Sequence, residues 1–460
     1  MRVYGCQMNV YDSDRVRTAL TRRGWKEVPE DEADVVVFTG CSVRGKAEQK
    51  VWSELGRYAP NWNKNRRPFV ALTGCIAQSL GEKALSRYPW IRLVSGPRHI
   101  GLLPETLERI FKNGNAVPNN SYTIVNSPSA LERIVEGGRA VLLDEDPREF
   151  YDLNEISEVR ENKYRAYVTI AHGCDNFCTY CIVPYVRGRF LSRPSADVLS
   201  EVRALLESGA KEITLLGQNV NSYGNDFNDG YGFAALLRDV ARTGVERVRF
   251  VTSLPQDFTE KIVDVMASEP NVCPSLNLPI QAGSDRILKL MNRKYTRAEY
   301  MEKIQMVRSR LSELGLTSDL IVGFPGETEE DFEDSMSALS EIKFDLVHTA
   351  AYSEREGTPA ATMPGALPHE VRMERLNRIN ALQDGITFSI NRALAGQRAS
   401  ILVDGTAQKG ETPDGRPLLQ GRTPTDKVVL LAGDEELLGR TVTAEITEAG
   451  SWYLKGVIVD

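Results

Sequence analysis

Three cysteines lie within eight residues of one another, and this spacing constrains the chain more than any other feature. Cys174, Cys178 and Cys181 directly follow Tyr167–Ile170, a β-branched stretch typical of a strand. Three thiolates in one loop can bind three irons of a four-iron cluster and leave the fourth iron open to a chelating substrate. Structural zinc loops instead prefer paired Cys-x-x-Cys units with a fourth ligand. No further Cys or His follows this loop at such a spacing, so the loop predicts an iron–sulfur site.

The overall composition is typical of a soluble globular protein. The chain has 460 residues, 42% apolar and 26% charged, which predicts more than one domain and most simply three. No apolar run reaches about 18 residues and the N-terminus lacks a signal core, so we expect a cytoplasmic protein with no membrane contact. Seven cysteines in a reducing compartment indicate metal binding rather than disulfides. A net charge of −7 argues against general coating of nucleic acid but allows a local basic groove.

Residues 1–125 predict an N-terminal α/β domain with a parallel sheet. Val35–Phe38 and Phe69–Leu72 are each followed by Thr-Gly-Cys and then by a helix-like segment. Cys41, Cys75 and the Gly-preceded Cys6 are therefore expected at strand ends, where open α/β sheets bind ligands. Adjacent strands lie about 5 Å apart, so three such loops can converge on one site. Without further information, scattered cysteines are more often inert core residues.

Residues 126–159 are polar and predict a linker, and residues 160–392 predict a central partial (β/α)6 barrel that carries its chemistry at the carboxyl ends of its strands. Its six expected strands are Tyr167–Ile170, Glu212–Leu216, Arg247–Phe250, Leu276–Leu278, Ser318–Val322 and Leu346–Ala350. Residues 393–460 contain short β-branched runs separated by Gly and Pro, which predict a small antiparallel, OB-like β-barrel. The predicted fold class is therefore multidomain α/β.

The cluster loop and its flanks resemble the methylthiotransferases of the radical-SAM superfamily. The stretch from Gly173 to Gly188, GCDNFCTYCIVPYVRG, is most similar to those that modify N6-isopentenyladenosine in tRNA. The resemblance implies a [4Fe-4S] cluster on Cys174, Cys178 and Cys181 that binds and reductively cleaves S-adenosylmethionine (SAM). The last domain resembles the RNA-binding TRAM domain.

The segments around the three N-terminal cysteines resemble the same family. Cys6 lies in GCQMN, Cys41 in CSVR and Cys75 in GCIAQ, which implies an auxiliary [4Fe-4S] cluster on these three residues. One departure is Gly40, which stands where the family usually has Thr. The remaining cysteine, Cys273, is expected to be a buried or incidental thiol.

The resemblance continues through the strand ends of the central domain, although each segment alone would be an ordinary turn. Leu254 stands where relatives carry His, and Ala282 where Ser is commoner. The match implies SAM contacts at Gly217, Gln218, Ser253, Gln281, Asp319, Val322 and Tyr352.

Arginines and aromatic residues alternate just after the cluster loop. Arg187, Arg189 and Arg193 lie among Tyr185 and Phe190, and such a pattern suits phosphate contact and base stacking on RNA. The alternative is a solvated basic edge.

The implied activity is methylthiolation of carbon 2 of N6-isopentenyladenosine next to the tRNA anticodon. The implied partners are the tRNA anticodon stem-loop, an electron donor of the flavodoxin or ferredoxin type, and a sulfur or cluster donor. Alternatives are a methylthiotransferase for threonylcarbamoyladenosine or for a ribosomal-protein aspartate, against which Gln218–Asn221 speaks. A zinc-containing RNA-binding protein is the non-catalytic alternative.

Overall fold

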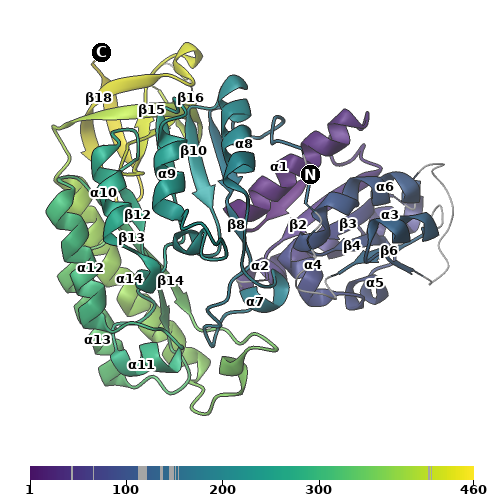
Figure 1. Cartoon of the computed structure of the whole chain (residues 1–460), viewed down its shortest axis with the longest axis horizontal. Coiled ribbons are helices and arrows are strands. Elements are labelled where there is room, and N and C mark those ends of the chain that lie inside the picture. Colours follow the sequence, from purple (N-terminus) through teal and green to yellow (C-terminus); the bar gives the residue numbers. More distant parts are fainter. Residues whose placement is uncertain are drawn as a thin grey trace. The chain divides into compact units, whose positions relative to one another are not determined.

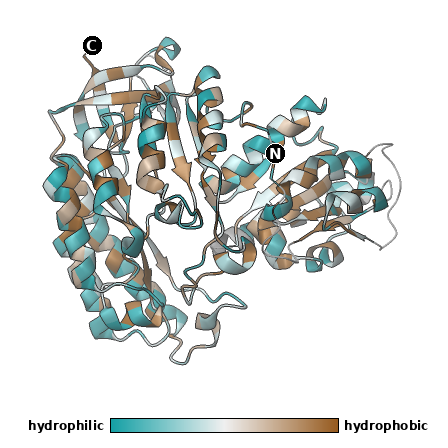
Figure 2. Ribbon diagram, in the orientation of Figure 1, coloured by the Kyte–Doolittle hydropathy of each residue, from teal (hydrophilic) through white to brown (hydrophobic). Residues whose placement is uncertain are grey.

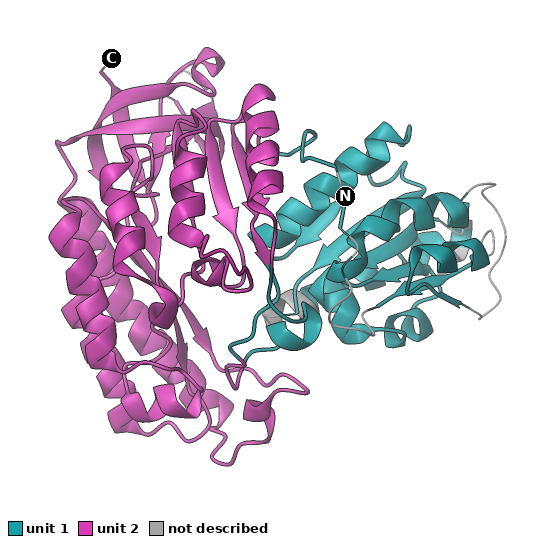
Figure 3. Cartoon of the chain, in the orientation of Figure 1, with its two compact units in different colours: residues 1–161, 172–176, 181–191 teal, residues 162–171, 177–180, 192–460 magenta. Residues whose placement is uncertain are grey.

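The computed structural model describes residues 1–42, 45–65, 67–111, 122–134, 138–143, 150, 152–153, 155–412, 415 and 417–459. It divides into two compact units (Figure 3). Unit 1 comprises residues 1–161, 172–176 and 181–191, and unit 2 comprises residues 162–171, 177–180 and 192–460. The loop with the three clustered cysteines therefore contributes residues to both units. No helix in the described part of the chain is long and apolar enough to cross a membrane.

Unit 1 is built on a six-stranded sheet in the order β1-β2-β3-β4-β6-β5, with every pair parallel. The strands are β1 (Arg2–Tyr4), β2 (Val35–Gly40), β3 (Phe69–Thr73), β4 (Ile91–Ser95), β5 (Thr123–Ile124) and β6 (Ala140–Leu142). The helices are α1 (Gln7–Arg22), α2 (Gly45–Gly56), α3 (Ala59–Asn65), α4 (Cys75–Leu80), α5 (Lys83–Arg87) and α6 (Leu103–Phe111).

Both faces of this sheet are buried, which explains why its strands read as continuous apolar runs. Side chains alternate along β2, so that Val37 joins one core with residues of α1 and α6. Val36 and Phe38 point to the other face and pack in a second core with Leu55 of α2. The two cores hold the carboxyl ends of β1, β2 and β3 beside one another.

The predicted linker of residues 126–159 contributes to unit 1, since its Ala130, Leu131 and Leu153 belong to the core. Its segment Ala140–Leu142 forms β6, which lies between β4 and β5 in the sheet. Val94 pairs with Val141 in parallel register, and the strand is buried. These residues therefore belong to the core of unit 1.

The six strands of the central domain follow one another in unit 2 as predicted (Figure 1). Two parallel three-stranded sheets, β11-β10-β7 and β12-β13-β14, are joined by a bridge between Val248 and Val272. The strands are β7 (Arg165–Thr169), β10 (Glu212–Leu216), β11 (Arg247–Phe250), β12 (Ser275–Asn277), β13 (Gly315–Val322) and β14 (Leu346–Ala351). This arrangement confirms the expected partial barrel.

Helices connect these strands: α8 (Ser195–Glu207), α9 (Phe233–Ala241), α10 (Glu260–Ser268), α11 (Asp285–Leu290), α12 (Arg297–Arg310), α13 (Glu329–Ile342) and α14 (His369–Arg392). Figure 2 shows hydrophobic colouring on central strands such as β10 and hydrophilic colouring on the outer side of α12 and α13. The apolar strands are thus covered by helices that bury their apolar side chains, such as Leu236, Leu237 and Val240 of α9.

The last residues form the closed barrel that the sequence predicts, in the order β15-β16-β17-β19-β18. Its strands are β15 (Arg398–Glu411), β16 (Pro417–Arg422), β17 (Val428–Leu431), β18 (Thr441–Ala449) and β19 (Leu454–Ile458). The expected antiparallel pairing is wrong at one place, because β17 and β19 pair in parallel. Arg249 of β11 donates hydrogen bonds of 2.8 and 2.6 Å to the carbonyls of Pro424 and Thr423, which ties this barrel to the central domain.

Candidate functional site

The three N-terminal cysteines lie at the carboxyl ends of adjacent strands. Cys6 is the N-cap of α1, two residues beyond β1; Cys41 follows β2 directly, and Cys75 opens α4 two residues beyond β3. The parallel registers β1–β2 and β2–β3 place these ends next to one another. The structure thus brings together the predicted auxiliary set within unit 1.

The Cys6 and Cys41 thiols lie within hydrogen-bonding reach of each other. That bond lowers the pKa of Cys6 to about 5, and the positive charge of Arg187 acts in the same direction. Burial raises the pKa of Cys75, against the attraction of the same Arg187. Since the thiolate is the metal-binding form, a lowered pKa of Cys6 favours metal binding.

The side chain of Asn9 connects these cysteine loops. It accepts a hydrogen bond of 3.2 Å from the Cys6 thiol and donates one of 3.3 Å to the carbonyl of Gly40. Gly74 has a φ of +86°, and a Cβ there would lie 2.7 Å from both Asn9 Nδ2 and the Gly40 oxygen. Only glycine therefore fits before Cys75. Asn9 was not among the predicted site residues; its signal is the Cys-x-x-Asn spacing, which places it one turn into α1.

The donor set fits an iron–sulfur cluster. Among the residues that the structure describes, no three Cys, His, Asp or Glu side chains are grouped as ligands of a single metal ion. A four-iron cluster occupies a larger space, because each thiolate bonds a different iron. Three soft sulfur donors on neighbouring strand ends suit that geometry better than a closed zinc shell.

The second cysteine loop is held by its backbone. A Cβ on Gly173, which has a φ of +70°, would collide with the carbonyl of Arg189. In unit 1 the backbone amide of Cys174 donates to the carbonyl of Gly188. The side-chain amide of Asn176 donates to the Cys174 sulfur at 3.3 Å. All three cysteines of this loop are partly exposed. The thiols are therefore accessible while the loop around Cys174 is fixed.

In unit 2, the Thr179 side of the same loop is anchored separately. The Thr179 amide donates to the carbonyl of Met291 at 3.1 Å, and its hydroxyl donates to that of Leu290 at 2.9 Å. Phe177 has a φ of 45°, a conformation that residues other than glycine seldom adopt. Such strain is found at sites where the surroundings hold the backbone for function.

The predicted SAM-binding residues lie in unit 2, at or just beyond strand ends except for Asp319, which lies within β13. Gly217 and Gln218 follow β10, and Ser253 follows β11. The Gln281 amide donates to the carbonyl of Asp319 at 2.9 Å, and the Tyr352 amide donates to that of Val322 at 2.8 Å. The side-chain amide of Asn277 donates a hydrogen bond to Asp319 Oδ2 at 3.3 Å. The structure therefore connects Gln281 with Asp319 and Val322 with Tyr352, and it adds Asn277, which the sequence alone did not single out.

Two hydroxyls of this set have the character of ligand-binding groups. Ser253 Oγ and Tyr352 Oη are buried and have no hydrogen-bond partner within the described residues. Buried polar groups are almost always paired, so an unpaired one is a candidate for pairing with a bound ligand or water. Thr252 and Gln281 also have positive φ, of 65° and 67°, at the same strand ends. Both hydroxyls are therefore available to pair with a polar ligand such as SAM.

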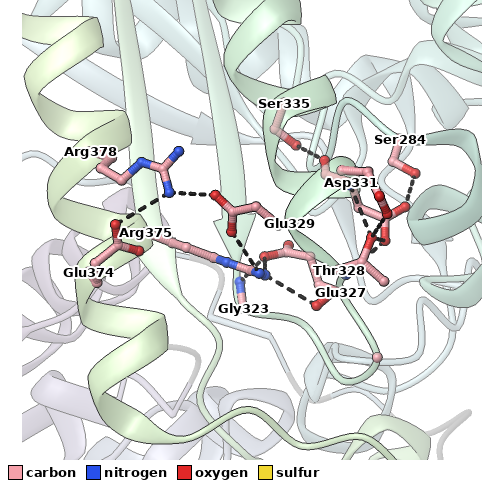
Figure 4. A network of polar contacts seen from close by, with 12 residues as sticks. Ser284, Gly323, Glu327, Thr328, Glu329, Asp331, Ser335, Glu374, Arg375 and Arg378 are labelled. Carbon is pink, nitrogen blue, oxygen red and sulfur yellow. Dashed lines mark hydrogen bonds and ion pairs between the residues drawn. The ribbon is translucent and has the colours of Figure 1, made fainter.

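The loop after β13 is supported from α14 by a network of charges (Figure 4). Glu327 accepts hydrogen bonds from the Gly323 amide at 2.8 Å and from Arg375 at 2.6 Å. Burial raises the pKa of Glu327, and the Gly323 and Arg375 donors oppose this effect. Arg372, one turn earlier on α14, donates to the carbonyl of Tyr352 at 2.6 Å. α14 therefore fixes the loops that carry Val322 and Tyr352.

The three arginines predicted to contact RNA have different surroundings. Arg187 is 4% exposed and donates to Cys75 and Asp12, so the prediction that it contacts RNA is not supported by its position. The Arg193 side chain is 14% exposed and pairs with Glu201 at 2.7 Å. Only Arg189, with a side chain 58% exposed and paired with Asp175, presents its guanidinium to solvent. Cys273 is buried, as expected.

Comparisons with known proteins agree with this architecture. The sequence matches the descriptions Radical SAM superfamily over residues 168–339, Uncharacterized protein family UPF0004 over residues 1–96 and TRAM domain over residues 392–459. A solved structure of the radical S-adenosylmethionine methyltransferase TsrM from Kitasatospora setae shares the fold. Its TM-score is 0.54 at 15% identity, with 88% of this chain and 79% of that chain covered.

Relatives that match over their whole length are more informative. The tRNA-2-methylthio-N(6)-dimethylallyladenosine synthase of Moorella thermoacetica is 43% identical, covering 99% of this chain and 97% of the relative. The enzyme of the same name from Carboxydothermus hydrogenoformans is 40% identical, with 99% and 98% covered. Because the identity extends over nearly the entire chain, this protein belongs to the family of radical-SAM tRNA-2-methylthio-N(6)-dimethylallyladenosine synthases.

Proposed function

We propose that the chain adds a methylthio group to carbon 2 of N6-isopentenyladenosine adjacent to the tRNA anticodon. The observation that carries this proposal is the gathering of Cys6, Cys41 and Cys75 at three adjacent strand ends, in a chain that also has the Cys-x3-Cys-x2-Cys loop. The second set is what a sulfur-inserting enzyme needs in addition to a radical source. The names of the full-length relatives support the same activity.

The cysteines would hold two [4Fe-4S] clusters, on Cys6, Cys41 and Cys75 and on Cys174, Cys178 and Cys181. When bound, the clusters supply the electron that cleaves SAM to methionine and a 5′-deoxyadenosyl radical, and the sulfur that is transferred. At carbon 2 of the base, a C–H bond is replaced by a C–S bond. The hydrogen leaves on 5′-deoxyadenosine, and the methyl group comes from a second SAM.

The chain's own residues bind and orient the reactants. We assign polar contacts with SAM to the Ser253 and Tyr352 hydroxyls, which have no partner among the described residues, and Thr252 and Gln281 near them have positive φ. We assign the amino group of SAM to Gly217 and Gln218, and the adenosine part to Asp319 and Val322. The target base must leave its stack to reach such a site, and a base in an anticodon loop is inexpensive to unstack.

The tRNA anticodon stem-loop is the macromolecular partner, and the TRAM domain supplies part of its contact surface. Arg189 is the arginine of the cluster loop that is positioned for phosphate contact. The reaction also requires an electron donor of the flavodoxin or ferredoxin type and a sulfur or cluster donor. We assign the reaction to the cytoplasm, the compartment in which reduced cysteines are the rule.

The test is anaerobic incubation of the reduced, iron-loaded enzyme with SAM and isopentenylated tRNA, followed by mass spectrometry of the nucleosides. We expect the isopentenyladenosine to gain one methylthio group in place of hydrogen. Parallel reactions contain threonylcarbamoylated tRNA and unmodified tRNA. No gain on isopentenyladenosine, or a gain on threonylcarbamoyladenosine instead, would overturn the proposal.

A further inference from the structure

Arg187 lies six residues beyond Cys181 in the radical-SAM loop, yet its side chain contacts a cysteine of the other set. We infer that Arg187 is a positioning residue of the auxiliary cluster, which orients the Cys75 sulfur and holds a fixed positive charge against it. The inference rests on the proposed function, because it assumes a cluster on Cys6, Cys41 and Cys75.

The contact is specific and buried. Arg187 Nε donates to Cys75 Sγ at 3.1 Å, and Nη2 donates to Asp12 Oδ2 at 3.2 Å. The side chains of Arg187 and Asp12 are only 5% and 6% exposed. A buried guanidinium is stabilised only if its charge is paired and its donors are used. Here the partners are one carboxylate and one cysteine sulfur.

The backbone around Arg187 is fixed by neighbours within unit 1. Its carbonyl accepts a hydrogen bond from Arg98 at 3.2 Å. The next residue, Gly188, has a φ of +74°, and a Cβ there would collide with the Arg98 guanidinium. Ile182 and Val186, which precede Arg187, pack with Cys75 in one small apolar cluster. The segment 181–191 is therefore built against the Cys75 loop, and Arg187 is its polar contact.

Hydrogen bonds to cluster sulfurs and the net charge near them set the reduction potential of iron–sulfur centres. A fixed cation beside a ligand sulfur stabilises the reduced cluster, which carries one more negative charge. Arg187 should therefore raise the potential of the auxiliary cluster and favour its retention. Asp12 keeps the guanidinium in place.

The inference can be tested with the full chain in which Cys174, Cys178 and Cys181 are changed to Ala, so that one cluster remains. Into this background we would introduce R187Q, R187K and, as a matched control, R22Q. Arg22 lies on α1 like Asp12, but it is exposed and pairs with Glu158 on the surface. The readouts are iron per chain, circular dichroism and an anaerobic redox titration followed by electron paramagnetic resonance.

We expect R187Q to shift the midpoint potential to more negative values or to lose iron while remaining folded. R187K should have a midpoint potential close to that of the parent, because Lys keeps the positive charge. R22Q should leave the potential unchanged. If R187Q fails to fold, the resonance spectrum of R187K decides: a changed spectrum supports the Nε–sulfur contact, which Lys cannot reproduce, and an unchanged spectrum contradicts it. R187Q with the potential and iron content of the parent would overturn the inference but not the proposed function. If the parent binds no iron, Cys6, Cys41 and Cys75 hold no cluster, and the proposed function itself is contradicted.

Discussion

The side-chain amide of Asn9 donates a hydrogen bond of 3.3 Å to the carbonyl oxygen of Gly40, the residue before Cys41. The same side chain accepts a hydrogen bond from the Cys6 thiol. Asn9 is fully buried, so no water can replace these bonds. One amide thus sets the relative position of two cysteine loops that are 35 residues apart in the sequence.

Replacing Asn9 with Ala should weaken unit 1 and its cluster. Loss of a buried hydrogen-bonding side chain typically costs about 1–3 kcal/mol of unfolding free energy. We expect N9A to unfold at lower denaturant concentration and, without Cys174, Cys178 and Cys181, to retain less iron per chain. The matched control is N61A on α3, where Asn61 is exposed. Equal iron content and stability in N9A and its parent would contradict this role.

Removing either unpaired hydroxyl of the proposed SAM pocket should impair binding without harming the fold. Tyr352 Oη and Ser253 Oγ make no hydrogen bond among the described residues, so Y352F and S253A remove no hydrogen bond between residues that the structure describes. A lost hydrogen bond to a polar ligand, about 1 kcal/mol, corresponds to roughly 5-fold weaker SAM binding. Calorimetric titration with SAM and thermal melting check this. A lower melting temperature with unchanged SAM affinity would show that the hydroxyls are structural.

The buried ion pair between Glu327 and Arg375 should contribute far more to the free energy of unfolding than the exposed pair between Arg378 and Glu329. Both side chains of this pair are buried, and breaking such a pair costs about 3–5 kcal/mol because it leaves a buried charge. Arg378 pairs with Glu329 near the surface, where a pair contributes about 0–1 kcal/mol. R375M should therefore lower the unfolding free energy and the SAM affinity, whereas R378Q should change both little. Denaturant titration and SAM binding measure the difference, and equal effects would contradict the account.

The contribution of Asp331 to the free energy of unfolding should depend on pH. Its carboxylate accepts hydrogen bonds from Ser284 at 2.6 Å and from the Thr328 amide at 2.8 Å. Together with Arg286, these donors hold its pKa well below the usual value, against the effect of burial. A lowered folded-state pKa gives stability that is present above the unfolded-state pKa of about 4 and is lost as the pH falls.

We therefore expect D331N to be less stable than the parent by about 2–3 kcal/mol at pH 7, since bonds to a charged acceptor are lost. The difference should shrink as the pH falls below about 4. Urea denaturation of both proteins at several pH values is the measurement. A difference that stays constant or grows toward acid pH would contradict the assignment.

Much of the fold follows from local sequence patterns. The six strands of the central domain were predicted in the right order, with Glu212–Leu216 and Arg247–Phe250 exact, whereas β13 begins three residues before the predicted Ser318. β6 was missed because Ala140–Leu142 is only three residues long and lies in a polar stretch. Its place in the sheet depends on pairing with β4, a long-range contact that local patterning does not contain. The parallel pairing of β17 with β19 escaped prediction for the same reason.

The sequence predicts those site residues that lie in recognisable motifs, such as the cysteines. Cys6, Cys41 and Cys75 converge because parallel strands end on one edge, a rule that applies to sequence alone. Arg187 was assigned to RNA because aromatic and basic residues surround it in the sequence. Its true contacts, Cys75 and Asp12, lie more than 100 residues away along the chain. Asn9 and Arg375 likewise act through partners that only the folded chain brings near.

In the proposed function the two cysteine sets hold two separate four-iron clusters, and the number of irons per chain distinguishes this from a single cluster. Anaerobically reconstituted protein, the triple Ala variant of Cys6, Cys41 and Cys75, and the triple Ala variant of Cys174, Cys178 and Cys181 would be compared. We predict about eight irons per chain in the parent and about four in each variant. Four irons in the parent, with none lost on changing Cys6, Cys41 and Cys75, would contradict the account.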